Sequence, residues 1–283
     1  MSSAIIRLVE RHRWVPVWAA LTTLYVVWGS TYAAILVAVR WLPPLLMSSL
    51  RFGIAGLLLY VVARRAGAPA PGLRGWVGAA IAGFALLVLG NAGVAWSELR
   101  VGSGIAALLV ATTPLWMVLI DRFASGVRLH AGVIGGLLVG LVGVGLLVAP
   151  SGAGGIDLVG GLAVLGCSIA WAAGSIFARG DRVPSHPLLA AGAQMLVASV
   201  VLAAAGAATG ELHHIAAPST GPVLAFAYLV VVGSIVAYSA YAWLLRSGAP
   251  TALVSTYAYA NPVIAVLLGW AALGEPLTAR TLV

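Results

Sequence analysis

Two short sets of aromatic and hydroxyl side chains, one in each half of the chain, have the chemistry to bind a small molecule. The sets are Tyr25, Trp28 and Tyr32 in the first half, and Ser168, Trp171 and Ser175 in the second. The same number of residues separates Tyr25 from Ser168, Trp28 from Trp171 and Tyr32 from Ser175, and we call this interval the repeat offset. Members of each set are three and four residues apart, so on a helix they share one face.

Rings on such a face would stack on a solute while hydroxyl groups hold its polar end. The alternative is that the two tryptophans only fill space between helices. Only the repeated spacing speaks for binding.

Other polar side chains lie inside apolar segments. They are Asn91, a face with Ser234, Tyr238 and Tyr241, and a face with Ser255, Tyr259 and Pro262. Their alternative role is to hydrogen-bond neighbouring helices or carbonyl groups freed by proline, and Asn261 is interpreted in that way. The binding site predicted from both groups consists of Tyr25, Trp28, Tyr32, Asn91, Trp171, Ser175, Tyr238 and Tyr259.

Arg51 is the clearest charge within an apolar segment, where ionisable groups are costly. It could bind a carboxylate, pair with Glu98 or extend to the membrane surface, and we favour a structural role. Glu98 and Asp121 lie at segment ends, so neither fits a proton carrier at the centre of a bilayer. A site of rings, hydroxyls and amides suits neutral or zwitterionic solutes better than sugar phosphates or nucleotide sugars, which require several cations.

The parts of an enzyme are lacking. The five histidines all fall in or beside connections, namely His12, His130, His186, His213 and His214. No buried Ser–His pair is therefore expected, and the adjacent pair at 213–214 has no acidic or cysteine companion for a metal. We predict no catalytic residue, no metal and no cofactor, with an intramembrane enzyme as the alternative from another class. The arginines lie in short connections rather than along a basic stripe, so no nucleic acid partner is predicted.

The composition places these residues in a lipid bilayer. Of 283 residues, 62% are apolar and 8% charged, and the mean hydropathy is +1.08, which leaves too little polar surface for a water-soluble domain. The apolar runs lack the alternation of a membrane barrel, so helices must satisfy the backbone. We predict an all-α integral membrane protein with helices near 14–39, 45–63, 75–96, 101–121, 130–149, 158–178, 187–208, 221–245 and 250–273.

The arginines also predict the orientation of the chain. With the N-terminus in the cytoplasm, eleven arginines lie on the inner side and three on the outer side, as the positive-inside rule requires. The first segment follows Arg7, Arg11 and Arg13, is too long for a signal peptide and has no clear cleavage site. The expected location is the bacterial inner membrane, which the chain crosses many times.

A five-helix unit is duplicated along the chain. Besides the two faces related by the repeat offset, the interval from Pro114 to Gly126 equals that from Pro262 to Gly274. Because five is odd, the second unit must enter the membrane in the opposite sense. The prediction is a ten-helix inverted repeat.

The first unit would span 1–149 and the second 150–283, so nine helices are present and the tenth would follow Val283. The predicted fifth helix also carries glycines every four residues, at Gly132, Gly136 and Gly140. Such a stripe allows close backbone packing, with dimerisation as the functional alternative. We expect a monomer or a weak homodimer.

Several short motifs resemble a known group of transporters. They are Trp28-Gly29-Ser30, Arg51-Phe52, Pro114, Asn261-Pro262 and Gly274-Glu275-Pro276-Leu277. Together they resemble the EamA-type exporters of the drug/metabolite transporter superfamily, over essentially the whole chain. The resemblance implies a ten-helix inverted repeat that exports small metabolites, often amino acids. One departure is Val127, which stands where the second repeat has Glu275.

These observations predict a carrier that exports small neutral metabolites by alternating access. Amino acids, including hydrophobic and aromatic ones, are the expected substrates, and the lipid bilayer is the other partner. The alternatives are a multidrug or other metabolite exporter, or an intramembrane enzyme. A channel or structural subunit is disfavoured, because neither predicts an inverted repeat with matched proline breaks.

Overall fold

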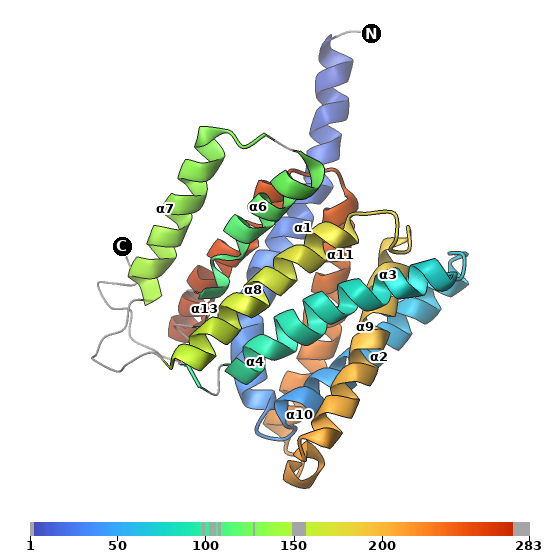
Figure 1. Cartoon of the computed structure of the whole chain (residues 1–283), viewed down its shortest axis with the longest axis vertical. Coiled ribbons are helices and arrows are strands. Elements are labelled where there is room, and N and C mark those ends of the chain that lie inside the picture. Colours follow the sequence, from blue (N-terminus) through green and yellow to red (C-terminus); the bar gives the residue numbers. More distant parts are fainter. Residues whose placement is uncertain are drawn as a thin grey trace.

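The computed structural model is built from helices (Figure 1). It describes residues 3–97, 100–101, 106, 109–126, 128–148 and 157–273. The helices of the first half are α1 (Ser3–Ala38), α2 (Pro44–Arg65), α3 (Leu73–Gly83), the π-helical η1 (Phe84–Ala92), α4 (Gly93–Ser97), α6 (Thr113–Ser125) and α7 (Ala131–Val148). Those of the second half are α8 (Leu158–Ala178), α9 (Pro187–Ala208), η2 (Glu211–His214), α10 (Thr220–Tyr228), the π-helical η3 (Leu229–Val236), α11 (Ala237–Arg246), α12 (Thr251–Val254) and α13 (Tyr257–Leu273).

The helix boundaries follow from local sequence. Helices α2 and α9 both begin with proline, at Pro44 and Pro187, where the fixed φ fits a helix and no amide donor is lost. The side chain of Asp157 caps α8 by accepting a hydrogen bond from the amide of Gly160 at 2.8 Å. Helix α6 ends at Gly126, whose φ of 68° suits glycine.

Helix occurs, within the described part of the chain, in each apolar segment predicted from the sequence. The bounds of α8 and α9 match the prediction, whereas the segment 101–121 is described as a continuous helix only from Thr113. The Gly-Glu-Pro-Leu motif at 274–277 lies outside the described residues. By length and apolar composition, five described stretches could cross a bilayer: Pro44–Arg65, Leu73–Ser97, Leu158–Ala178, Pro187–Ala208 and Thr220–Arg246.

The first helix of each half packs mainly against helices of the other half. Helix α1 packs mainly against α10, η3, α11 and α13, which all belong to the second half. Helix α8 in turn packs against α3, η1, α4 and α6 of the first half. The two faces predicted from the repeat offset, which lie on α1 and α8, are thereby brought to the centre of the molecule.

The most extensive contact between the halves joins α2 and α9. A Cβ atom on Gly56 would lie 3.0 Å from the carbonyl oxygen of Gly192. Further along, the Ser49 hydroxyl donates to the carbonyl oxygen of Ser199 at 2.9 Å. The two pairs are equivalent in the repeat, because the repeat offset relates Gly56 to Ser199 and Ser49 to Gly192. The contacts advance in opposite directions along the two helices, so α2 and α9 are antiparallel, as an inverted repeat requires.

The third long helix of each half is interrupted at the same place. Stretches η1 and η3 are π-helical, and they contain Asn91 and Ser234, which are again related by the repeat offset. Such wide turns inside an α-helix frequently occur at functional sites. Both interruptions lie beside the candidate site described below.

Helix α7 stands apart from the other helices (Figure 1). Its described contact is with α13, where the Tyr259 hydroxyl donates to the Leu137 carbonyl oxygen at 2.9 Å. A Cβ atom on Gly140 would meet the Tyr259 ring at 2.7 Å, whereas one on Gly132 or Gly136 would meet nothing within 4 Å. The glycine stripe thus packs at one position, and dimerisation through it stays a prediction.

Candidate functional site

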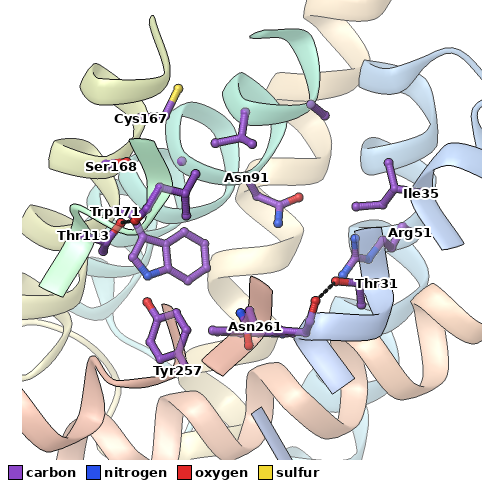
Figure 2. Close-up of a pocket in the computed structure, with 15 residues that line it drawn as sticks. Thr31, Ile35, Arg51, Asn91, Thr113, Cys167, Ser168, Trp171, Tyr257 and Asn261 are labelled. Carbon is purple, nitrogen blue, oxygen red and sulfur yellow. Dashed lines mark hydrogen bonds between the residues drawn. The ribbon is translucent and has the colours of Figure 1, made fainter. Parts of the chain in front are cut away.

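A cavity of about 110 Å³ lies at the centre of the bundle, between the two halves of the chain (Figure 2). Its walls come from α1, α2, η1, α4, α6, α8 and α13. Engineered cavities of ~150 Å³ bind benzene, so a solute group of about that size fits the space. The aromatic side chains that line it are Trp28, Trp171 and Tyr257, and the polar ones are Thr31, Arg51, Asn91, Thr113, Ser168 and Asn261.

Aromatic rings close one side of this cavity. The ring of Trp28 lies 5.5 Å from that of Trp171 and 4.9 Å from that of Tyr257, both at 83°, and these are favourable edge-to-face contacts. The structure therefore brings the two symmetry-related tryptophans into direct contact. Because α1 and α8 belong to different halves, this contact crosses the boundary between the repeats.

Tyr241 supports the tryptophan contact from behind. Its hydroxyl accepts a hydrogen bond from Trp171 Nε1 at 3.1 Å and shares another with the Ser175 hydroxyl at 2.5 Å. Ser175 also bonds to the carbonyl oxygen of Trp171 at 2.7 Å. Both Tyr241 and Ser175 are fully buried, so Ser175 positions Trp171 and does not line the cavity.

Three predicted tyrosines bond to other helices and do not line the cavity. The Tyr25 hydroxyl is 2.5 Å from the Thr256 hydroxyl, which ties α1 to the start of α13. Tyr238 donates to the side-chain oxygen of Gln194 at 2.7 Å, and Tyr259 bonds to α7 as described above. Of the eight predicted residues, Trp28, Asn91 and Trp171 line the cavity, and the side chain of Tyr32 lies outside the described residues.

Sequence reasoning missed two side chains of the cavity. Thr31 follows Trp28 by three residues and Tyr257 precedes Asn261 by four, so both share a helical face with a polar or aromatic residue that was considered. Asn261 was interpreted as repairing the kink at Pro262, yet it lines the cavity as well. The usable signal was the i+3 and i+4 spacing.

The polar groups of the cavity differ in whether they are satisfied. Thr31 Oγ1 donates to the Trp28 carbonyl oxygen at 2.7 Å, and Thr113 Oγ1 donates to that of Val110 at 2.6 Å. The hydroxyl groups thus bond to their own helices. In contrast, Asn261 Oδ1 is buried and accepts no hydrogen bond. Buried polar atoms without a partner are rare in native proteins, so this atom has capacity for a ligand.

Arg51 is the one charged residue among the described side chains that line the cavity. It is 4% exposed, and its Nε donates to the Ser234 hydroxyl of η3 at 2.6 Å. Its Nη1 is buried without a hydrogen-bond partner. No described carboxylate forms an ion pair with it, and Glu98, the acid considered as one of three alternatives, lies outside the described residues.

A polar network closes the end of the bundle at which α8 terminates. Arg179 Nη1 lies 3.5 Å from Asp121 Oδ2, and the Thr251 hydroxyl hydrogen-bonds to both side chains. The Arg179 guanidinium also donates to the carbonyl oxygens of Leu245 at 3.0 Å and Ala249 at 2.6 Å. The network joins α6, α8, α11 and α12, and we call this the closed end.

The cavity extends the other way. From the Trp28–Trp171 contact it runs along Thr31, Ile35 and Ala95 toward the end where α1 and α4 terminate, and it is not fully enclosed. We call this the open end. Among the described residues, no three His, Cys, Asp or Glu side chains are close enough together to hold a metal ion.

Comparisons with known proteins agree with this architecture. The model of the EamA-like transporter family matches twice, at residues 15–149 and 158–283. The uncharacterized inner membrane transporter YedA of Escherichia coli is 41% identical over 265 residues, which cover 93% of this chain and 85% of that protein. A probable amino-acid metabolite efflux pump of the same species is 27% identical over 78% of this chain and 75% of its own length.

A solved crystal structure has the same fold. It superposes with a TM-score of 0.75 and 23% sequence identity, over 93% of this chain and 90% of the other. At that identity the likeness speaks for the fold alone.

Proposed function

The chain belongs to the EamA-like transporter family and is a membrane transporter, and on that premise we propose that it exports small neutral metabolites through the central cavity. Amino acids, including hydrophobic and aromatic ones, are the proposed substrates. Transport occurs by alternating access, in which the two repeats move against one another around a site between them.

The observation that carries this proposal is the cavity bounded by Trp28 and Trp171. The two residues occupy equivalent positions in the two repeats and touch across the boundary between them. A rocking motion of one repeat against the other would separate these rings and open the closed end. A solute held beside them would then be exposed on the other side of the membrane.

The walls of the cavity support the proposed substrate class. Rings of Trp28, Trp171 and Tyr257 fit an apolar or aromatic side chain. Arg51, the one cation among the described lining residues, is too little charge for a phosphate-bearing sugar. The same cation disfavours the cationic compounds that many multidrug exporters move. The relative named as a probable amino-acid metabolite efflux pump agrees with this assignment.

The proposed location and orientation of the chain rest on the arginines and on a relative, and the proposed direction of transport rests on the family alone. The short connections place most arginines on the side of the N-terminus, which is then cytoplasmic. The relative at 41% identity is named as an inner membrane transporter, so we assign the chain to the same membrane. In this orientation the closed end faces the cytoplasm and the open end faces outward.

Flux into proteoliposomes tests this function. The purified chain is reconstituted and offered labelled tryptophan, phenylalanine, leucine and serine, beside a nucleotide sugar and a cationic dye. Saturable flux of an amino acid, recovered chemically unchanged, is the expected result and separates a carrier from a channel and from an enzyme. Flux of only the dye or only the sugar would overturn the proposed substrate class.

A pair of tryptophan variants locates the site. Trp28→Ala should lower the flux about tenfold, because it removes a wall of the cavity, while the folded fraction in detergent stays nearly unchanged. Trp41→Ala is the matched control, since Trp41 contacts Phe226 at 5.8 Å away from the cavity. Equal flux in both variants, or unfolding of the first, would support a packing role for Trp28.

A further inference from the structure

Arg51 is a buried cation that no carboxylate among the described residues balances. It lies about two turns from the start of α2, is 4% exposed, and forms no ion pair within the described part of the chain. Moving a charge out of water is costly unless a counter-charge or a full set of hydrogen bonds compensates it. Nε donates to Ser234 and the guanidinium carbon lies 5.2 Å from the centre of the Phe52 ring, whereas Nη1 is buried without a hydrogen-bond partner. Such a cation is complementary to an anionic ligand.

The position of Arg51 points to the ligand that supplies this charge. Its guanidinium group borders the cavity, close to Thr31 and Ile35 on α1 (Figure 2). A planar guanidinium binds a carboxylate better than any other neutral-pH cation in proteins does. The equivalent position in the second repeat is Gln194, which is neutral and already bonded to Tyr238. Among the described residues the cavity therefore has one cation, at one end, and fits a solute with one carboxylate.

A second unsatisfied group lies on the same cavity. Asn261 Oδ1 is a buried acceptor without a donor, on α13 rather than α2. An ammonium group of a ligand has the N–H donors that this oxygen lacks. The rings of Trp28 and Trp171 provide the apolar part of the wall between these polar groups. The three features together match the three parts of an amino acid.

We propose that the cavity selects solutes by a free carboxylate, which binds Arg51 Nη1, while Asn261 Oδ1 accepts a hydrogen bond from the α-ammonium group. This assignment rests on the proposed function only in taking the central cavity as the transport site. It makes the substrates α-amino acids with an uncapped carboxyl group, with the side chain against the two tryptophans. Arg51 is then the residue that distinguishes a carboxylate from an amide or an ester.

A series of indole compounds tests the assignment without changing the ring. Tryptophan, tryptophanamide and indole-3-propionate differ only in the carboxylate or the ammonium group. Binding to the purified chain is measured by the rise in its melting temperature and by competition with labelled tryptophan. Tryptophan should bind at least about tenfold more tightly than tryptophanamide, which is the usual size of a hydrogen bond to a charged group.

Variants then assign the preference to single residues. Arg51→Gln should bind tryptophan and tryptophanamide equally, and Arg51→Lys should retain part of the preference. Ser234→Ala is the matched control, because it removes the partner of Nε and leaves Nη1 in place. Asn261→Ala should lose the preference for tryptophan over indole-3-propionate and keep that for the carboxylate.

The melting temperature of the ligand-free protein separates an anchor from a structural residue. If Arg51 binds ligand, Arg51→Gln removes an unbalanced charge and should melt at the same or a higher temperature. A structural Arg51 predicts a lower melting temperature and an unchanged carboxylate preference, and that pair of results would overturn the proposal. If the glutamine variant fails to fold, Arg51→Lys is measured instead: a reduced carboxylate preference is expected, and an unchanged preference would overturn the proposal.

The outcomes also distinguish this inference from the proposed function. Amino-acid flux with equal binding of tryptophan and tryptophanamide would leave the function standing and remove Arg51 from it. Absence of any amino-acid flux, with a carboxylate preference that Arg51→Gln abolishes, would overturn the function and retain the carboxylate site.

Discussion

Along α1 and α8, equivalent positions lie in opposite surroundings. On α1, Tyr25 lies on the side of the closed end, bonded to α13, while Thr31 beyond Trp28 lines the cavity. On α8 the order is reversed, since Ser168 lines the cavity and Ser175 beyond Trp171 is buried behind it. Helices α1 and α8 thus run in opposite directions. The equivalent faces of the two helices line the cavity only toward the open end. The repeats share a fold but differ in conformation, which is the asymmetry that alternating access requires.

The two ends also differ in what can close them. The closed end is held by the ion pair of Asp121 with Arg179, whose side chains are 12% and 21% exposed. The repeat offset relates Arg179 to Leu36, so the equivalent helix end of the first repeat carries no charge there. An ion pair equivalent to that of Asp121 with Arg179 therefore cannot form at this position of the open end. The polar network favours the observed conformation, with the cavity open away from it.

Breaking the network should have the largest effect of the changes considered. Asp121→Ala leaves the Arg179 guanidinium partly buried without its carboxylate, which destabilises the closed end. Flux should fall nearly to the level of protein-free liposomes. Ala249 is 4% exposed, and a cysteine placed there in a Cys167→Ser background reports whether this end opens. In the Asp121→Ala variant this cysteine should react with a membrane-impermeant thiol reagent at least about tenfold faster than in the protein that keeps Asp121.

The control for this change is an exposed ion pair. Arg74→Gln removes the pair with Asp181, whose side chains are 72% and 82% exposed, and should alter neither flux nor cysteine reactivity. Equal cysteine reactivity with and without Asp121 would contradict the view that the network keeps this end closed.

On the cavity side, a single methyl group should have an intermediate effect. A Cβ atom on Gly90 would lie 2.8 Å from Trp171 Cε3, so Gly90→Ala must displace the indole ring. We expect amino-acid flux to drop about tenfold with the folded fraction preserved. Gly166→Ala on α8 is matched to it, because a Cβ atom there would meet nothing within 4 Å. Comparable flux in the two variants would show that the position of Trp171 is unimportant.

The boundary between the two regions should give the smallest effect. Tyr241→Phe removes the acceptor of Trp171 Nε1 and leaves the ring packing intact, so tryptophan affinity should weaken about threefold, in line with one hydrogen bond. Ser175→Ala keeps that acceptor and should change the affinity less. Competition binding measures both, and a larger effect of the serine variant would reassign the support of Trp171.

Sequence reasoning located the helices and the repeat because both have periodic signals. The bounds of α8 and α9 coincide with apolar runs between proline, glycine and charged residues, and the repeat offset identified the two tryptophan faces. Which side of a face meets a cavity depends on the neighbouring helix, and Tyr238 and Tyr259 therefore bond elsewhere. The π-helical stretches were not predicted, since a shift in backbone hydrogen bonding leaves no pattern in the side chains.

Because α1 packs against the second half of the chain, the helices cannot pack in the order in which they are synthesised. The main partners of α1 lie in α10, η3, α11 and α13, which the ribosome produces long after α1. At roughly 5–20 residues per second, α1 waits on the order of 10–40 s in the membrane before those partners exist. The first repeat therefore cannot complete its packing before the second repeat has been synthesised, and the two halves assemble jointly.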